Sequence, residues 1–269
     1  VVFSAVAGYF LGAEQPALQP LLLLTFGGYC MVGASNAFNQ VIERNLDAKM
    51  HRTRHRPIPS GRMKVSTALW IASLMTLAGV VLLYLLNPKT ALFGALSIFL
   101  YTCVYTPLKT VTPLAVFVGA FPGAIPFMLG WVAATNTFGI EPGTLFMIQF
   151  FWQFPHFWAL GWMLDEDYRR GGFKMLPTGK KDTGTAVQII MYTIWMIVIS
   201  VIPVFGITGR LSLSIPSAVL IFLMGLVMLW FALRLYERRD RKSARSLMLS
   251  SVTYISLIQI VYVIDKFLT

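Results

Sequence analysis

Long apolar runs separated by short polar breaks constrain the fold of this chain more than any other feature. A helix needs about 20 mostly apolar residues to cross the hydrocarbon layer of a membrane. The composition agrees with several crossings, because 57% of the residues are hydrophobic and only 12% are charged. The sequence therefore predicts an all-α integral membrane protein. Its eight clear spans are expected near 17–39, 65–86, 90–107, 111–134, 143–164, 186–208, 214–235 and 246–266.

The first residues, 1–12, are apolar but too short to span, and they lack the charged start of a signal peptide. We expect them to be the end of a truncated first helix, which gives about nine transmembrane helices in all. Cys30 and Cys103 both lie in predicted spans without metal-binding spacing, so we expect them to be packing residues.

The basic residues are distributed unevenly over the predicted loops. Of the 22 Lys and Arg residues, 19 fall in alternate loops, and the exceptions are Lys89, Arg210 and Lys266. This is the positive-inside pattern of membrane proteins. It accounts for the net charge of +11 without nucleic acid as a partner. We expect a multi-pass protein of the cytoplasmic (inner) membrane, with its basic loops on the cytoplasmic face and its C-terminus outside.

Two of these loops match when the sequence is shifted by 118 residues. "DAKMHRTRHRPIPSGR" from Asp47 then aligns with "DEDYRRGGFKMLPTGK" from Asp165. We expect one domain, 1–269, built from two parallel four-helix pseudo-repeats, about 1–110 and 111–235, plus an extra helix at 246–266. Pseudo-symmetric packing of the halves would bring the two loops together into one site.

Asn39, Glu43 and Asp47 recur every four residues, so on a helix they would share one face. Carboxylates at membrane depth tend to face a wet cavity, and oxygen ligands suit Mg²⁺, which often binds phosphates as well. The arginines that follow suit phosphate oxygens; they are Arg52, Arg54, Arg56 and Arg62. The pattern favours a diphosphate site. The alternative is that these arginines only set the topology and pair with the acids, but the acids and bases of the matching loop favour the site.

The three histidines lie in two different contexts. His51 and His55 could suggest a zinc pair, but the interleaved arginines repel a cation, so we expect solvated loop residues. His156 lies in the aromatic segment "FWQFPHFWAL". It is either a hydrogen-bonded packing residue or a group facing a flat, apolar acceptor, as an iron ligand or a base. Lys109 in "YTPLKT" either reaches the phosphates or is an ordinary turn residue.

The motifs together resemble those of the intramembrane prenyltransferases of the UbiA superfamily, and in particular the branch that farnesylates haem. They are "NQVIER", "RTRHRP", "YTPLKT", "WQFPHFWAL" and "DYRRGGFKMLP", and the resemblance covers essentially the whole chain. It implies a helical bundle around a central cavity open to lipid. It also implies Mg²⁺-dependent transfer of a farnesyl group from farnesyl diphosphate to a vinyl group of haem b, which gives haem O.

The resemblance also implies roles for individual residues. Asn39, Glu43 and Asp47 would be catalytic, with both acids as metal ligands, and Asp165 and Asp167 would serve a second metal. His156 would be catalytic and would meet the haem. The expected diphosphate contacts are Arg52, Arg56, Lys109, Arg170 and Lys174. Beyond haem b, farnesyl diphosphate and the lipid bilayer, a downstream haem A synthase is a further candidate partner.

Two other functions fit parts of the pattern. A prenyltransferase for an aromatic quinone precursor would need a polar pocket for a small aromatic acid, whereas the segment around His156 is rich in aromatic side chains. A transporter of an anionic solute also shows repeats and intramembrane charges. Both charged loops lie on one predicted membrane face, however, which argues against alternating access.

Overall fold

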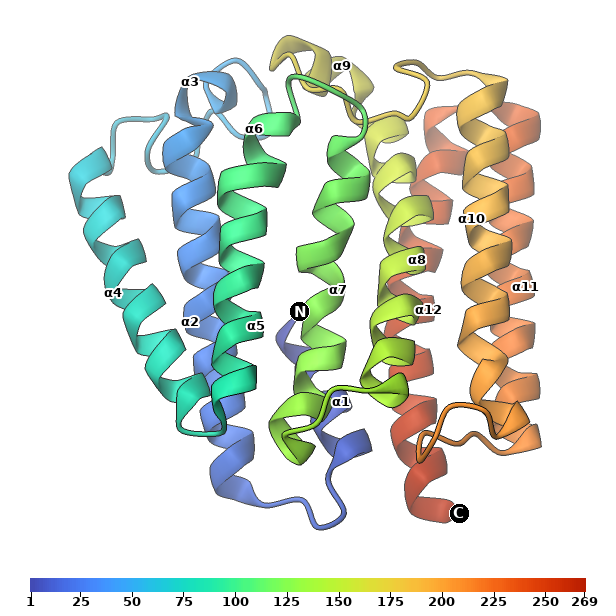
Figure 1. Ribbon diagram of the computed structural model, residues 1–269. Helices are drawn as coiled ribbons and strands as arrows, with labels where there is room; N and C mark the ends of the chain where they lie inside the picture. Colours follow the sequence, from blue (N-terminus) through green and yellow to red (C-terminus); the bar gives the residue numbers. More distant parts are fainter.

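The computed structural model describes residues 1–269 as helices joined by loops, without any strand (Figure 1). The long helices are α2 (Leu18–Ile42), α4 (Val65–Tyr84), α5 (Pro88–Phe99), α7 (Ala115–Thr135), α8 (Ile140–Met163), α10 (Thr183–Val201), α11 (Ile215–Arg238) and α12 (Arg241–Leu268). The short ones are α1 (Val2–Gly12), α3 (Arg44–Asp47), α6 (Thr106–Leu108) and α9 (Asp165–Arg170).

The prediction of an all-α membrane protein is confirmed. Seven helices are long and apolar enough to cross a membrane. An eighth long helix, α8, occupies the fifth predicted span. It is less hydrophobic than the other seven because it contains Gln, Pro, Trp and His residues. Large apolar side chains also cover the outer faces of α4 and α11, where Trp70, Leu77, Phe222 and Trp230 are exposed. Such an apolar belt is suited to contact with lipid chains.

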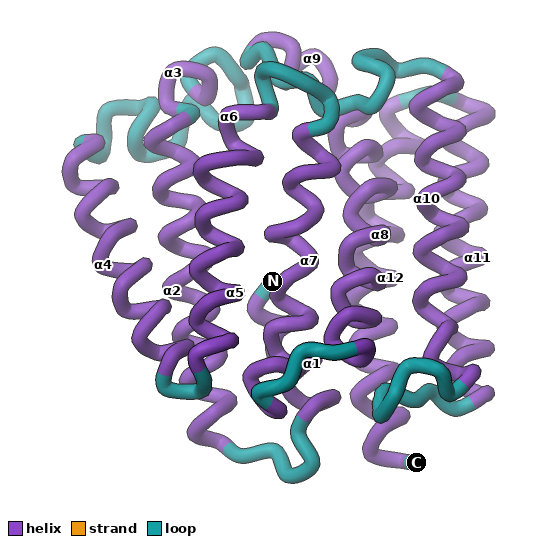
Figure 2. The backbone as a smooth tube through the Cα atoms, in the orientation of Figure 1, coloured by secondary structure: helices purple, strands orange, loops and turns teal.

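The helices stand side by side in one bundle, and the short helices α3, α6 and α9 gather at one end of it, the top of Figure 1. The loops, short helices and helix ends on this side carry 19 of the 22 Lys and Arg residues, and we call it the basic end. Helix α7 is central and packs against α1, α5 and α8. The tube drawing in Figure 2 shows that loops are confined to the two ends of the bundle.

Polar side chains mark where several helices begin. Asp182 precedes α10 and accepts the backbone N–H of Thr185 at 2.8 Å, while Asp240 does the same for Ser243 at the start of α12, at 2.6 Å. Asn87 caps α5, whose first residue is a proline. These side chains satisfy backbone donors that have no partner in the first turn.

The third predicted span is a helix of changing pitch. Beyond α5 the backbone forms a π-helical segment, Leu100–Tyr105, before α6. Such segments are rare and often occur at functional sites. This one rotates Tyr101 and Tyr105 relative to a regular helix. Both tyrosines line the central cavity described below. Helix α8 remains helical through Pro155, the proline in the aromatic segment.

Glycines allow α1 and α7 to approach each other closely. A Cβ atom on Gly8 would overlap the backbone oxygen of Phe127, and one on Gly130 would overlap the backbone oxygen of Ala5. Any larger residue at either position would push the two helices apart.

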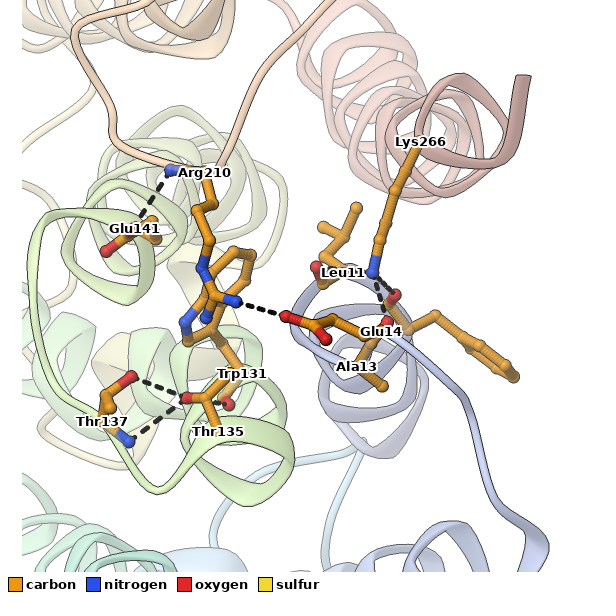
Figure 3. A network of polar contacts seen from close by, with 10 residues as sticks. Leu11, Ala13, Glu14, Trp131, Thr135, Thr137, Glu141, Arg210 and Lys266 are labelled. Atoms are coloured by element: carbon orange, nitrogen blue, oxygen red, sulfur yellow. Dashed lines mark hydrogen bonds and ion pairs between the residues drawn. The ribbon is translucent and has the colours of Figure 1, made fainter. Parts of the chain in front are cut away.

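Ionic contacts tie helices together at the end opposite the basic end (Figure 3). Lys266 of α12 donates to the backbone oxygens of Phe10 and Leu11, at 2.8 and 3.0 Å, and so caps the C-terminus of α1. The Arg210 guanidinium lies 3.0 Å from the Glu14 carboxylate, and its backbone N–H donates to Glu141 at 3.2 Å.

The two halves show the same order of elements. In the first half a long helix, the short α3 and two further long helices follow one another, and α8, the short α9, α10 and α11 repeat that order. The division into pseudo-repeats 1–110 and 111–235 stays a prediction, as does the count of nine spans.

Candidate active site

The predicted polar column lies at the basic end and is buried. Asn39 and Glu43 are 6% and 4% exposed, and Asp47 has no exposed surface. The column is not carried by one continuous helix, because α2 ends at Ile42 and α3 begins at Arg44, with Glu43 as the link. The backbone N–H of Asp47 still donates to the Glu43 carbonyl at 2.7 Å, so the three side chains stay close to one face.

Each member of the column has its own partner. Asn39 donates from Nδ2 to the hydroxyl of Thr106 at 3.2 Å. Glu43 Oε1 forms an ion pair with Lys109 Nζ at 2.7 Å. Asp47 Oδ2 forms one with Arg56 at 2.8 Å. Two acids and two bases from three segments of the chain therefore meet in a largely dry environment.

The other carboxylate oxygen of Asp47 tests whether a metal ion fits here. Oδ1 is buried and has no hydrogen-bond partner, which is rare because such an atom loses its hydration without compensation. It lies in a set of amide and carboxylate oxygens, the ligands that Mg²⁺ accepts. The residues present thus fit a hard cation. The chain has no group of three or more His, Cys, Asp and Glu side chains that could hold a metal by themselves, so other ligands would have to complete the shell.

Aromatic rings surround Lys109. Its Nζ lies 4.6 Å from the centroid of the Tyr105 ring and 5.6 Å from that of Phe173, distances at which a ring face attracts a cation. Burial lowers the pKa of the Lys109 ammonium below its ordinary value, and the Glu43 carboxylate opposes part of that shift. The turn residue thus points into the site.

The second acidic motif contacts the first basic loop. Asp167 on α9 accepts the backbone N–H of His51 at 2.7 Å and that of Arg52 at 3.2 Å, one with each carboxylate oxygen. The Arg52 guanidinium lies 6.0 Å from the centroid of the Tyr168 ring. Burial raises the pKa of the Tyr168 hydroxyl, and the positive charge of Arg52 offsets part of that rise. The two matching loops do meet, as their sequence similarity indicates.

The remaining predicted residues of the second half have charged or backbone partners. Asp165 lies 3.2 Å from Arg169 and 3.6 Å from Lys181. Arg170 is 4.0 Å from Asp167. Lys174 donates from Nζ to the backbone oxygen of Val111 at 2.9 Å, so its side chain contacts the turn after α6 and not the polar column. Their roles toward a metal or a diphosphate stay predictions.

A cavity of about 540 Å³ lies inside the bundle, within the roughly 300–1,000 Å³ of ordinary ligand pockets. Tyr105 joins this cavity to the polar column, because its ring faces Lys109 and also lines the cavity. A Cβ atom on Gly119 would overlap that ring. A second cleft of 540 Å³ lies between α5, α7 and α8 and is lined almost entirely by apolar side chains.

His156 lines the central cavity. Its ring stacks on Trp152 with centroids 4.7 Å apart and an interplanar angle of 18°, and it meets Phe157 edge to face. Its Nδ1 atom lies 2.9 Å from the hydroxyl of Ser251 on α12. The aromatic wall expected from the sequence is present, although Phe154 and Trp158 pack elsewhere, against Tyr192.

Sequence reasoning missed several polar groups of this cavity. Three glutamines line it, namely Gln149, Gln153 and Gln259. Gln259 on α12 donates to the side-chain oxygen of Gln149 on α8 at 3.0 Å. Glutamines that recur at helical spacing in an apolar span were the available signal. Ser251 had no comparable signal, because a lone serine is common in such helices.

Comparisons with known proteins agree with this architecture. Residues 1–258 match the UbiA prenyltransferase family. The chain is 66% identical to the protoheme IX farnesyltransferase of Flavobacterium psychrophilum, covering 100% of this chain and 90% of that protein. Among solved structures, the fold is similar to a UbiA homologue from Aeropyrum pernix, with a TM-score of 0.77, 16% identity and coverage of 99% and 96%. A UbiA homologue from Archaeoglobus fulgidus, bound to GPP and Mg²⁺, gives a TM-score of 0.69 at 13% identity, with coverage of 97% and 94%.

Proposed function

Since the chain belongs to the UbiA prenyltransferase family, we propose that it transfers a farnesyl group from farnesyl diphosphate to a vinyl group of haem b. The product would be haem O, and the reaction would depend on Mg²⁺. The name of the relative at 66% identity supports both donor and acceptor, and the GPP and Mg²⁺ of the Archaeoglobus homologue support a prenyl diphosphate with a metal. The basic end would face the cytoplasm, as the positive-inside pattern indicates.

One observation supports this proposal above the others. The buried pair Glu43–Lys109 and the partly buried pair Asp47–Arg56 connect through Tyr105 to a cavity of about 540 Å³ whose wall carries His156. An anion site directly beside a roomy aromatic pocket is what transfer from a diphosphate to a flat acceptor requires. The buried Asp47 oxygen without a partner adds a place for a cation.

The residues of the column would hold the diphosphate. Asn39, Glu43 and Asp47 supply the oxygen ligands, and Mg²⁺ bound there would stabilise the negative charge of the departing diphosphate. Arg56 and Lys109 lie against the same acids and would contact the anion bound beside them. Arg52, Arg170 and Lys174 are outer candidates for the same anion, and Asp165 and Asp167 for a second metal.

The chemistry would form one carbon–carbon bond and one carbon–oxygen bond, and would break the carbon–oxygen bond to the diphosphate. The electron pair of the vinyl group bonds to C1 of the farnesyl chain while the C1–O pair leaves with the diphosphate. Water then adds to the resulting carbocation and loses a proton, which leaves a hydroxyethylfarnesyl arm. Tyr105 and Trp152 provide ring faces that favour positive charge, and the apolar walls keep other water away from the reacting carbon.

Mass spectrometry of haem tests the proposal. Purified protein in detergent is incubated with haem b, farnesyl diphosphate and Mg²⁺. A product heavier by a farnesyl group plus water is expected, and it should disappear with EDTA. Asp47→Asn should reduce its formation by at least about 100-fold, because the carboxylate that would hold Mg²⁺ beside the departing anion is lost. Glu237→Gln, an exposed change on α11, is the matched control. Unchanged haem together with prenylation of an aromatic quinone precursor would refute haem as the acceptor. Flux of an anionic solute across liposomes without any product would refute the assignment as an enzyme.

A further inference from the structure

One serine of α12 holds the histidine of the central cavity in place. His156 Nδ1 lies 2.9 Å from the hydroxyl oxygen of Ser251, a residue with no exposed surface. Trp152, the ring stacked on the imidazole, donates its indole N–H to the backbone oxygen of the same serine at 2.6 Å. Ser251 therefore contacts both members of the stacked pair.

The surrounding hydrogen bonds fix the direction of the bond between Ser251 and His156. The serine hydroxyl also lies 2.6 Å from the backbone oxygen of Met248. A carbonyl oxygen can only accept, so the single hydroxyl proton of Ser251 is donated to Met248. The serine oxygen is then an acceptor toward the imidazole, and Nδ1 must carry the proton. In a neutral imidazole the lone pair is then on Nε2.

We propose that Ser251 is a positioning residue, which keeps the proton of His156 on Nδ1 and so leaves the lone pair of Nε2 available to the ligand in the cavity. The inference rests on the proposed function for the identity of that ligand, haem. Either role of His156, as an iron ligand or as a base, requires this lone pair. Histidines that bind metals almost always use their second nitrogen to donate to a partner that fixes tautomer and orientation. Here the partner comes from the last helix of the bundle.

Nuclear magnetic resonance can observe the tautomer without any ligand. The chain has three histidines, so replacing His51 and His55 with glutamine leaves only the imidazole of His156. With ¹⁵N-labelled histidine, the protein should show the proton on Nδ1. Ser251→Ala should move it toward Nε2, and Ser251→Thr, which keeps a hydroxyl, should restore it. The bond from Trp152 survives in both variants because it goes to the backbone.

Ser250→Ala is the matched control, because this neighbouring serine of α12 has no hydrogen bond to His156. It should leave the tautomer unchanged. The inference is overturned if the proton is on Nε2 in the unaltered protein, or if Ser251→Ala leaves it on Nδ1.

Haem titration separates this inference from the proposed function. Ser251→Ala should bind haem b about tenfold more weakly, with a shifted Soret band, which is the lower end of the effect of losing such a partner. Ser251→Thr should bind normally. If His156→Ala keeps the normal haem spectrum and product, the proposed role of His156 fails. If His156→Ala loses the haem spectrum while Ser251→Ala behaves as the unaltered protein in binding and tautomer, the inference about Ser251 alone is refuted.

Discussion

Lys109→Met is expected to destabilise the protein strongly, because it leaves the Glu43 carboxylate buried without a counter-charge. The two charged groups lie 2.7 Å apart, and their side chains are only 10% and 5% exposed. Solvent therefore screens them little. Breaking a buried pair by removing one partner destabilises proteins by about 3–5 kcal/mol.

That loss corresponds to a clear change in melting temperature. For a chain of this size, each kcal/mol shifts the midpoint by about 2–4 °C. A drop of roughly 6–20 °C is therefore expected, and intrinsic tryptophan fluorescence of the protein in detergent measures it. Lys180→Met removes the same charge from an exposed position and should change stability by less than about 0.5 kcal/mol.

A double variant distinguishes this explanation from simple loss of packing. Glu43→Gln added to Lys109→Met removes the unpaired charge, so most of the lost stability should return, because removing both partners of a buried pair is often nearly neutral. Mg²⁺ should also raise the melting temperature of Lys109→Met more than that of the unaltered protein, since it binds the released carboxylate. A single variant that melts within about 2 °C of the unaltered protein, or two substitutions with additive losses, would refute the reasoning.

Three further changes test other parts of the structure. Lys266→Met should destabilise the protein by about 1.5–3 kcal/mol, because the charged cap on the end of α1 is lost; thermal unfolding measures this, and an unchanged midpoint contradicts it. Gly123→Ala should reduce product formation and weaken haem binding, because its Cβ would overlap the Gln153 amide on the cavity wall. Haem binding of unchanged affinity would show that the wall adapts. The bond from Thr185 lowers the pKa of the Asp182 carboxyl, so its stabilising effect is complete above about pH 4 and is lost as the pH falls through the lowered value. Asp182→Asn should weaken that acid dependence, and identical pH profiles would exclude the cap as its cause.

Local patterns in the sequence were sufficient for the class of protein. Hydropathy predicted each long helix, because the hydrocarbon layer selects apolar runs of a given length regardless of what they pack against. The starts of α4 at Val65 and α10 at Thr183 fall within about three residues of the expected spans. The four-residue spacing of Asn39, Glu43 and Asp47 likewise placed them close to one face, although the helix is interrupted at Glu43.

The contacts between distant segments could be decided only by the tertiary structure. Asn39 and Thr106 are 67 residues apart, His156 and Ser251 are 95 apart, and His51 and Asp167 are 116 apart. Spacing along one helix cannot specify these pairs, because they depend on how the helices pack and rotate against each other. The sequence by itself determined a membrane protein with several spans, with its basic residues concentrated on one side and with a motif of acids followed by arginines. The packing of the helices decided which base each acid pairs with, which residues line the cavity, and which nitrogen of His156 is hydrogen-bonded to α12.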